Sequence, residues 1–318
     1  MADIKRRTLL GLIASLPIFG RCADADPPSF ELIPQLQAGQ HWRFAFERKV
    51  TRDGAVMNWH RAPLDVRVLQ ADPGGALLEW IEGPQTIIDA DPQRRPLLAL
   101  SLAAMREVPL RLRLDAAGRV QALANPAEVR GLCLALMDAA ASQLGQEAAP
   151  RDVVHAMLPA LKAAFGSDDL VAAATLREPM VLLGAMGRRF GADEPVQFRT
   201  ALANPLGGAP LPAIARFSIR AVQPRAKRAE LGWLMVSDPV ATGAMAQAGI
   251  DAALRIATAA AGQGASGAAL PAVLLEERGD FVVDTASAWP KRVAHQRSVR
   301  VGASAQVDTI TFSSPERS

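Results

Sequence analysis

The chain has 318 residues, of which 50% are hydrophobic and 21% are charged, and its formal net charge at pH 7 is +3. This length and hydrophobic content provide for one large folded domain or two modest ones. The small net charge argues against a nucleic-acid-binding protein, and two cysteines are too few for a disulfide framework.

The N-terminal segment, residues 1–25, has the pattern of a secretory signal peptide. A basic stretch precedes an apolar run from Thr8 to Gly20 that is too short to span a bilayer. Ala23 and Ala25 occupy the small-residue positions of a cleavage site, so we expect Asp26 to be the first mature residue. Loss of four basic and two acidic residues lowers the net charge from +3 to +1. The mature protein is then periplasmic and has no transmembrane segment.

Two export routes are compatible with this segment. Arg6 and Arg7 precede a variable residue and two leucines, which is the pattern of the twin-arginine signal. The general secretory route is the alternative, because paired arginines also occur in ordinary basic leaders. Cys22 is not expected to carry a lipid, because Arg21 stands where a lipidation signal has a small residue. The predicted cleavage removes Cys22.

Residues 41–83 have the pattern of a meander of strands. Trp42, Phe44 and Phe46 alternate with other residues, which places the aromatic side chains on one face. The sequences RDG and DPGG supply turns between the extended runs. Residues 108–123 repeat the pattern, with buried leucines alternating with arginines before a glycine turn and a return strand.

A helix is predicted over residues 125–145. Asn125 can cap it, Pro126 suits its first turn, and Glu128 falls at the capping-box position. Cys133, the one cysteine of the mature chain, lies in its apolar run. Core packing is therefore favoured over a redox role.

Further helices are predicted over residues 150–187. Pro159 and Pro179 interrupt this region, so we expect several short helices and not one long one. Asp168 and Asp169 stand at a helix start, where carboxylates complement the helix dipole.

Strands and one helix alternate in the C-terminal half. Extended runs are predicted at residues 195–202, 213–222 and 229–236, followed by a helix from Asp238 to Gly262 and by three extended runs within 279–314. The first two of these last runs are expected to join at a turn around Trp289 and Pro290. The order suggests one α+β domain over residues 26–318, with a loose duplication of halves at 26–190 and 191–318.

A glycine-rich stretch formally matches two functional motifs. Gly262, Gly264 and Gly267 have the spacing of a dinucleotide-binding loop, but a helix precedes them where that site requires a strand. Ser266 lies in a near match to a nucleophile elbow, yet Ala268 replaces its last glycine. We interpret the stretch as a flexible linker and predict no cofactor.

Metal binding is not predicted either. The histidines have no ligand spacing, so each is expected on a strand surface or helix face: His41, His60, His155 and His295. The acidic pair Asp193 and Glu194 is expected in a solvated loop.

The densest polar patch lies near the C-terminus. It consists of Lys291, Arg292, His295, Arg297 and Arg300, which alternation divides between the two faces of a strand. A solvated sheet edge and an anion site are the two interpretations, and the edge is favoured.

The export signal, the early aromatic strand, the hairpin before a helical insert and the terminal GDFVVD…WP stretch together resemble bacterial envelope proteins of unknown function. In architecture the chain is similar to lipoprotein carriers, in which a curved antiparallel sheet wraps apolar helices. The resemblance implies a half-barrel-like α+β fold, and it transfers no functional residue.

No catalytic, cofactor-binding or metal-binding residue emerges from these patterns. We therefore expect a non-enzymatic periplasmic binding or structural protein whose partner is an apolar small molecule or another envelope protein. A hydrolase with a dispersed site and an assembly partner are the alternatives. Adaptable side chains decide whether the interior is a solid core or a cleft: Met137, Met157, Met180 and Met186.

Overall fold

The computed structural model describes residues 30–92, 95, 98–99, 102, 108–144, 162, 166–191, 195–202, 211–238 and 273–314. The export segment lies outside these ranges. The twin-arginine pair Arg6 and Arg7 and the cleavage site between Ala25 and Asp26 therefore stay predictions.

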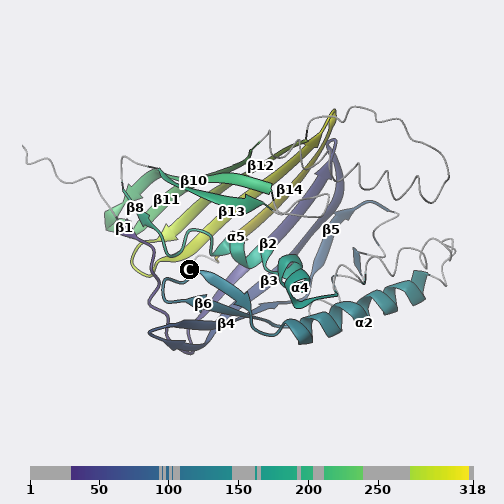
Figure 1. Ribbon diagram of the computed structural model, residues 1–318, viewed down its shortest axis with the longest axis horizontal. Helices are drawn as coiled ribbons and strands as arrows, with labels where there is room; N and C mark the ends of the chain where they lie inside the picture. The colour runs from purple at the N-terminus through teal and green to yellow at the C-terminus, as the bar shows by residue number, and fades with distance from the viewer. Residues whose placement is uncertain are drawn as a thin grey trace, which may run out of the picture.

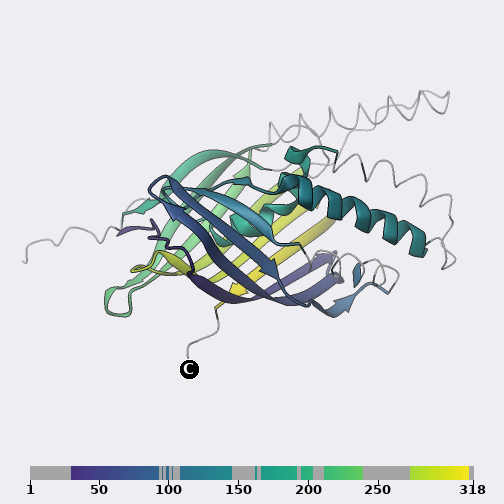
Figure 2. The same cartoon turned by 90° about the horizontal axis from the view of Figure 1, so that it is seen from below.

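Twelve strands form one open, curved antiparallel sheet (Figures 1 and 2). Its spatial order is β7 (Val120–Leu123), β6 (Leu110–Asp115), β4 (Gly75–Glu82), β3 (Ala55–Asp72), β2 (His41–Arg52), β14 (Ser304–Ser313), β13 (Trp289–Val301), β12 (Val273–Asp284), β11 (Arg228–Ser237), β10 (Leu211–Gln223) and β9 (Val196–Leu202). The twelfth strand, β5 (Thr86–Ala90), pairs with β3, and β1 (Phe30–Glu31) pairs with β8 (Arg189–Phe190) in a separate ribbon. The predicted curved α+β fold is confirmed.

The strand order explains where the helices must lie. β2 and β14, the first and last long strands, pair at the middle of the sheet. The two edges, β7 and β9, are consequently joined in sequence by the helical region between them. Its described residues 168–182 lie over the concave side of the sheet (Figure 2).

Side-chain alternation decides which face is inside. On β2, Phe44 and Phe46 are buried, and on β6 Leu110, Leu112 and Leu114 are buried while the arginines between them are exposed. Both predicted patterns are confirmed. The concave face is thus the apolar face, as expected for a sheet with one side in water.

The tight turn between β2 and β3 was also predicted. Asp53 and Gly54 both have positive φ values, 50° and 84°, which a two-residue hairpin of this type requires. This φ sign suits the right-handed twist of the two strands that the turn joins.

The described helices are α2 (Pro126–Leu144), α4 (Asp168–Thr175), α5 (Arg177–Leu182) and the 3₁₀ helix η1 (Pro224–Ala226). α4 begins with Asp168 and Asp169, as predicted, and its N-cap Ser167 accepts a hydrogen bond from the Leu170 amide at 3.3 Å. α4 and α5 are separate short helices, which confirms the expectation around Pro179. Among the described helices, none is long and apolar enough to cross a membrane.

Two local expectations require correction. Asn125 precedes α2, but its side-chain oxygen accepts from the Arg111 amide at 2.9 Å, so it ties the helix start to β6 instead of capping the helix. The turn between β12 and β13 lies at residues 285–288, before Trp289 and Pro290, which begin β13. The Asp284 carboxylate accepts backbone amides at 2.9 and 3.0 Å and so fixes the turn there.

The interior contains two apolar clusters. The larger one joins the concave side chains of β2, β3, β4, β12 and β14 to α2, α4 and α5. The smaller one lies on strands β9 to β12 and consists of Leu202, Leu211, Ala213, Ala215, Met235 and Leu275.

Cys133 belongs to the larger cluster. It is 5% exposed, and burial raises the pKa of its thiol, so the predicted core position is confirmed. The methionines are divided: Met186 is buried, Met137 is half-buried and Met180 is 59% exposed, while Met157 lies outside the described residues.

Several other predictions fall outside the described residues. They concern the helix after Asp238, the glycine motif at 262–267 with Ser266, and the side chains of His155, Asp193 and Glu194. Because the second helix belongs to this set, the duplication of halves also stays a prediction.

Candidate functional site

A band of charged side chains crosses the otherwise apolar concave face. Glu277, Arg297 and Asp308 lie directly opposite one another on β12, β13 and β14. Two residues further along the register, Arg48 on β2 lies opposite His60 on β3. With further members from β4, β13 and α5, this polar band consists of His60, Glu82, Arg48, Asp308, Arg297, His295, Glu277, Arg177 and Glu178.

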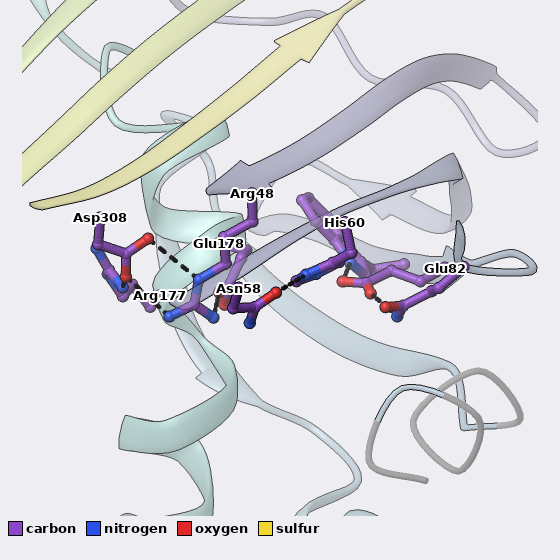
Figure 3. Close-up of polar contacts among 9 residues, drawn as sticks. Arg48, Asn58, His60, Glu82, Arg177, Glu178 and Asp308 are labelled. Atoms are coloured by element: carbon purple, nitrogen blue, oxygen red, sulfur yellow. Dashed lines mark hydrogen bonds and ion pairs between the residues drawn. The ribbon is translucent and has the colours of Figure 1, made fainter. Parts of the chain in front are cut away.

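Arg48 is the centre of the polar band (Figure 3). Its Nε and Nη2 donate to the two carboxylate oxygens of Asp308 at 3.2 and 2.8 Å, and its Nη1 donates to Glu178 Oε1 at 3.0 Å. Arg177 donates a short hydrogen bond to Asp308 Oδ2, the oxygen that also accepts from Arg48 Nη2. Both α5 residues therefore connect the helix to strands β2 and β14.

The electrostatic setting of this centre follows from its burial. Burial alone would lower the pKa of Arg48, but Glu178 and Asp308 outweigh it and raise that pKa. Burial would likewise raise the pKa of Asp308, yet Arg48 and Arg177 hold it below its usual value. Arg48 and Asp308 are therefore both ionised at neutral pH, and each stabilises the charge of the other.

Within the polar band, the pKa values of Glu82 and His60 are shifted the most. Burial, with a contribution from Glu178, raises the pKa of Glu82 to about 7. Among the described residues, its oxygens accept hydrogen bonds from two neutral donors, Trp80 Nε1 at 3.4 Å and Gln85 Nε2 at 2.9 Å. Burial and Arg48 lower the pKa of His60 to about 4, so its imidazole is neutral at pH 7. Its Nδ1 is 2.9 Å from the Asn58 side-chain oxygen (Figure 3).

The other end of the polar band is built around His295. Its Nε2 is 3.1 Å from Glu277, and its ring centroid is 5.2 Å from that of Trp233. Gly279 lies between these rings on β12, and a Cβ there would stand 3.3 Å from the Trp233 ring. The glycine therefore permits the close approach of the tryptophan and the histidine across the strand.

Trp233 also marks the boundary between the two apolar clusters, because it packs against both. Its Nε1 and the Nδ1 of His295 are buried, and neither has a hydrogen-bond partner in the described part of the chain. Two ring nitrogens are thus available for a polar group at this boundary.

The structure revises the expectation for the C-terminal cations. β13 lies inside the sheet between β12 and β14, so it is not a solvated edge. The predicted division between faces is confirmed: Lys291, Arg292 and Arg300 are exposed, whereas His295 and Arg297 turn inward. Arg297 is compensated by Glu277, whose Oε1 is 3.5 Å away.

The histidine prediction was correct for one residue and wrong for two. His41 lies on the sheet surface and contacts Asp65 at 2.6 Å. His60 and His295 are only 4% and 1% exposed, because Asn58 and Glu277 supply hydrogen-bond partners that offset the cost of burying the two rings. Within the described ranges, no Ser, Thr or Cys hydrogen-bonds to these three histidines, and no acidic, Cys and His cluster could hold a metal.

Sequence reasoning missed six members of the polar band: Arg48, Glu82, Arg177, Glu178, Glu277 and Asp308. A usable signal existed for two of them. Arg48 is in phase with the buried Phe44 and Phe46, and Asp308 is in phase with the inward face of its own strand. A charge at an inward position predicts a buried ion pair.

Comparisons with known proteins give little further guidance. No family model and no curated protein matches the chain. One matching solved structure is described as "Lipid-protein interactions in lipovitellin", with 8% sequence identity and a TM-score of 0.38. The match covers 87% of this chain and 25% of the lipovitellin chain, so the chain spans about a quarter of that protein's length.

Proposed function

We propose that the chain is an exported periplasmic envelope protein that binds an apolar ligand between its concave sheet and helix α5. The observation that carries this proposal is the way in which α5 covers the apolar face. Val181 and Leu182 of this six-residue helix are buried against the interior, while its first two residues are fastened to the sheet by ion pairs.

The surface beneath this helix is rich in aromatic rings. Phe312 contacts Phe46 and Trp80 at centroid distances of 5.3 and 5.7 Å, and Phe217 contacts Phe281 at 5.7 Å. The chain just after α5 lies against these aromatic rings, because a Cβ on Gly184 would lie 3.9 Å from Phe281. A ligand that displaced α5 would replace aliphatic contacts by its own on the same rings.

The mode of attachment makes such displacement feasible. Ion pairs that are partly solvated contribute less to stability than an equal number of buried apolar contacts. The side chains of Arg48 and Arg177 are 31% and 22% exposed. Water can therefore solvate these guanidinium groups when α5 moves, and the helix acts as a removable cover.

The ring nitrogens of Trp233 and His295 suit a ligand with one polar group. They lie at the boundary of the two apolar clusters, and each lacks a hydrogen-bond partner in the described chain. A hydroxyl or carbonyl on an otherwise apolar ligand would satisfy them.

The test is lipid extraction and native mass spectrometry of the full chain purified from the periplasm, joined to thermal melting with added fatty acid. A ligand at 100 times its dissociation constant stabilises the native state by about 2.7 kcal/mol. Trp233→Phe removes one ring nitrogen and should reduce the rise in melting temperature that fatty acid causes. Trp59→Phe, on the outer side of β3, should leave that rise unchanged. Absence of both co-purified lipid and a melting shift would contradict the proposal.

Glu82 favours the hydrolase alternative as a second candidate. A carboxyl group with a pKa of about 7 is suited to proton transfer at neutral pH. Screening with ester, peptide and glycan substrates tests it: turnover that Glu82→Gln abolishes would replace the binding proposal by an enzymatic one.

A further inference from the structure

The outer face of the sheet carries an exposed aliphatic patch. Ile214 on β10 is 50% exposed and lies directly opposite Val236 on β11, which is 42% exposed. Leu234 is the next outward residue of β11, and Leu274 occupies the neighbouring strand β12. These four side chains, the outer patch, are solvent-exposed and lie close together near the ends of their strands.

Arginines surround the outer patch in the sheet register. Arg199 lies opposite Ile214, and Arg300 lies opposite Leu274. Arg216 and Arg278 flank Leu234 from its two sides. Each of these three leucine and isoleucine side chains therefore has a guanidinium group as its cross-strand neighbour.

Most of this positive charge is uncompensated. Arg278 pairs with Glu276, which lies opposite Val236. Arg199, Arg216 and Arg300 make no ion pair with any residue that the structure describes. The patch thus combines an apolar centre with a cationic rim.

We propose that the outer patch docks onto an anionic membrane surface. Aliphatic side chains can enter the boundary between headgroups and acyl chains, while arginines extend their apolar stems along that boundary and bind lipid phosphates. The negative potential of anionic lipids attracts the cationic rim.

The composition of the patch distinguishes this occupant from a protein. Protein interfaces concentrate binding energy in Trp, Tyr and Arg anchors seated in pockets. The outer patch contains aliphatic residues without an aromatic ring, and it lies on an extended sheet face. Charge complementarity with a lipid surface is therefore the stronger explanation.

The experiment is sedimentation of the full chain with vesicles of equal parts phosphatidylglycerol and phosphatidylethanolamine, and separately with pure phosphatidylcholine vesicles. We expect binding to the anionic vesicles alone, weakened by salt. The triple variant R199E/R216E/R300E should reduce binding by about tenfold or more, since each cation near the surface contributes to attraction.

A matched variant, R61E/R67E/R113E, separates the patch from net charge. It changes three exposed arginines of the other half of the same sheet, and these also lack an ion pair among the described residues. Because both variants keep the same N-terminus, apolar contacts of that segment cannot explain a difference between them. Equal loss of binding in the two variants would overturn the proposal, as would unchanged binding of the patch variant.

Two further results decide the remaining cases. If the patch variant fails to fold by thermal melting, the milder I214S/V236T variant replaces it and should also weaken vesicle binding. If the wild-type chain does not bind anionic vesicles but self-associates through this face, the patch is a protein interface and the membrane proposal is wrong. None of these results depends on whether the concave face binds a ligand.

Discussion

Arg48 and Asp308 are 260 residues apart in the chain, yet they form a two-point ion pair across the neighbouring strands β2 and β14. This pair connects the first long strand to the last one at the middle of the sheet. It also holds α5, because Glu178 and Arg177 bind its two members. One carboxylate therefore binds two guanidinium groups that belong to different parts of the fold, and Glu178 supplies the second negative charge.

Removal of that carboxylate should be strongly destabilising. Asp308→Asn leaves the half-buried Arg48 and Arg177 without their shared acceptor, and leaving charged groups unpaired in this way costs about 1 to 3 kcal/mol. Denaturant unfolding measures the change. The control is Asp65→Asn, which disrupts a more exposed pair with His41 and should cost about 1 kcal/mol or less. Equal losses in both variants would contradict the role assigned to Asp308.

Glu82 should make stability depend on pH. Burial raises its pKa in the folded state to about 7 from the usual value of 4.5. The stabilisation by its bound proton is therefore complete below about pH 4.5 and is lost as the pH rises through 7. Glu82→Gln mimics the protonated group, so it should match wild type near pH 4.5 and be more stable by about 2 to 4 kcal/mol at pH 8. Urea unfolding at the two pH values checks this, and a constant difference would refute it.

Two glycine-to-alanine changes should have opposite effects. At Gly279 a Cβ would meet Phe281 at 3.1 Å and Trp233 at 3.3 Å, so Gly279→Ala should cost about 1 to 3 kcal/mol through overpacking. At Gly131, inside α2, a Cβ meets nothing within 4 Å. Gly131→Ala should therefore stabilise by about 0.5 to 1 kcal/mol. Thermal unfolding of both variants gives the signs directly, and a stabilising Gly279→Ala would show that the rings are not in contact there.

Cys133 should react only in the unfolded chain. It is buried, and burial raises the pKa of its thiol, so little thiolate is accessible to a reagent. Cys133→Ser should cost about 1 to 3 kcal/mol, because the hydroxyl is poorly satisfied in an apolar cluster. Labelling with a thiol reagent in buffer and in denaturant compares the two states. Rapid labelling of the folded protein would reopen a redox role.

The strands were predictable because their side chains alternate strictly. Phe44, Phe46 and the leucines of β6 indicated both strand and inward face, and the RDG turn indicated the hairpin. Local patterns of this kind depend on neighbours along the chain. They cannot specify which distant strand becomes a partner, so the pairing of β2 with β14 was not foreseen.

The polar band was not predictable for the same reason. Arg297 was interpreted as an edge residue because nothing in its own strand indicates that Glu277 and Asp308 lie opposite it on the neighbouring strands. Trp289 and Pro290 looked like a turn because proline favours turns, yet Asp284 already supplies that turn and Trp289 stacks on Trp42 with centroids 3.7 Å apart. Tertiary packing decided both cases.

The pairing of β2 with β14 affects how the chain folds. On a ribosome β2 is made early and β14 last among the described strands, so one edge of β2 stays unpaired until β14 has been synthesised. Pairing strands so far apart gives the fold a high contact order, which slows folding. We expect the two meanders to form as separate half-sheets and to join late, when Asp308 reaches Arg48.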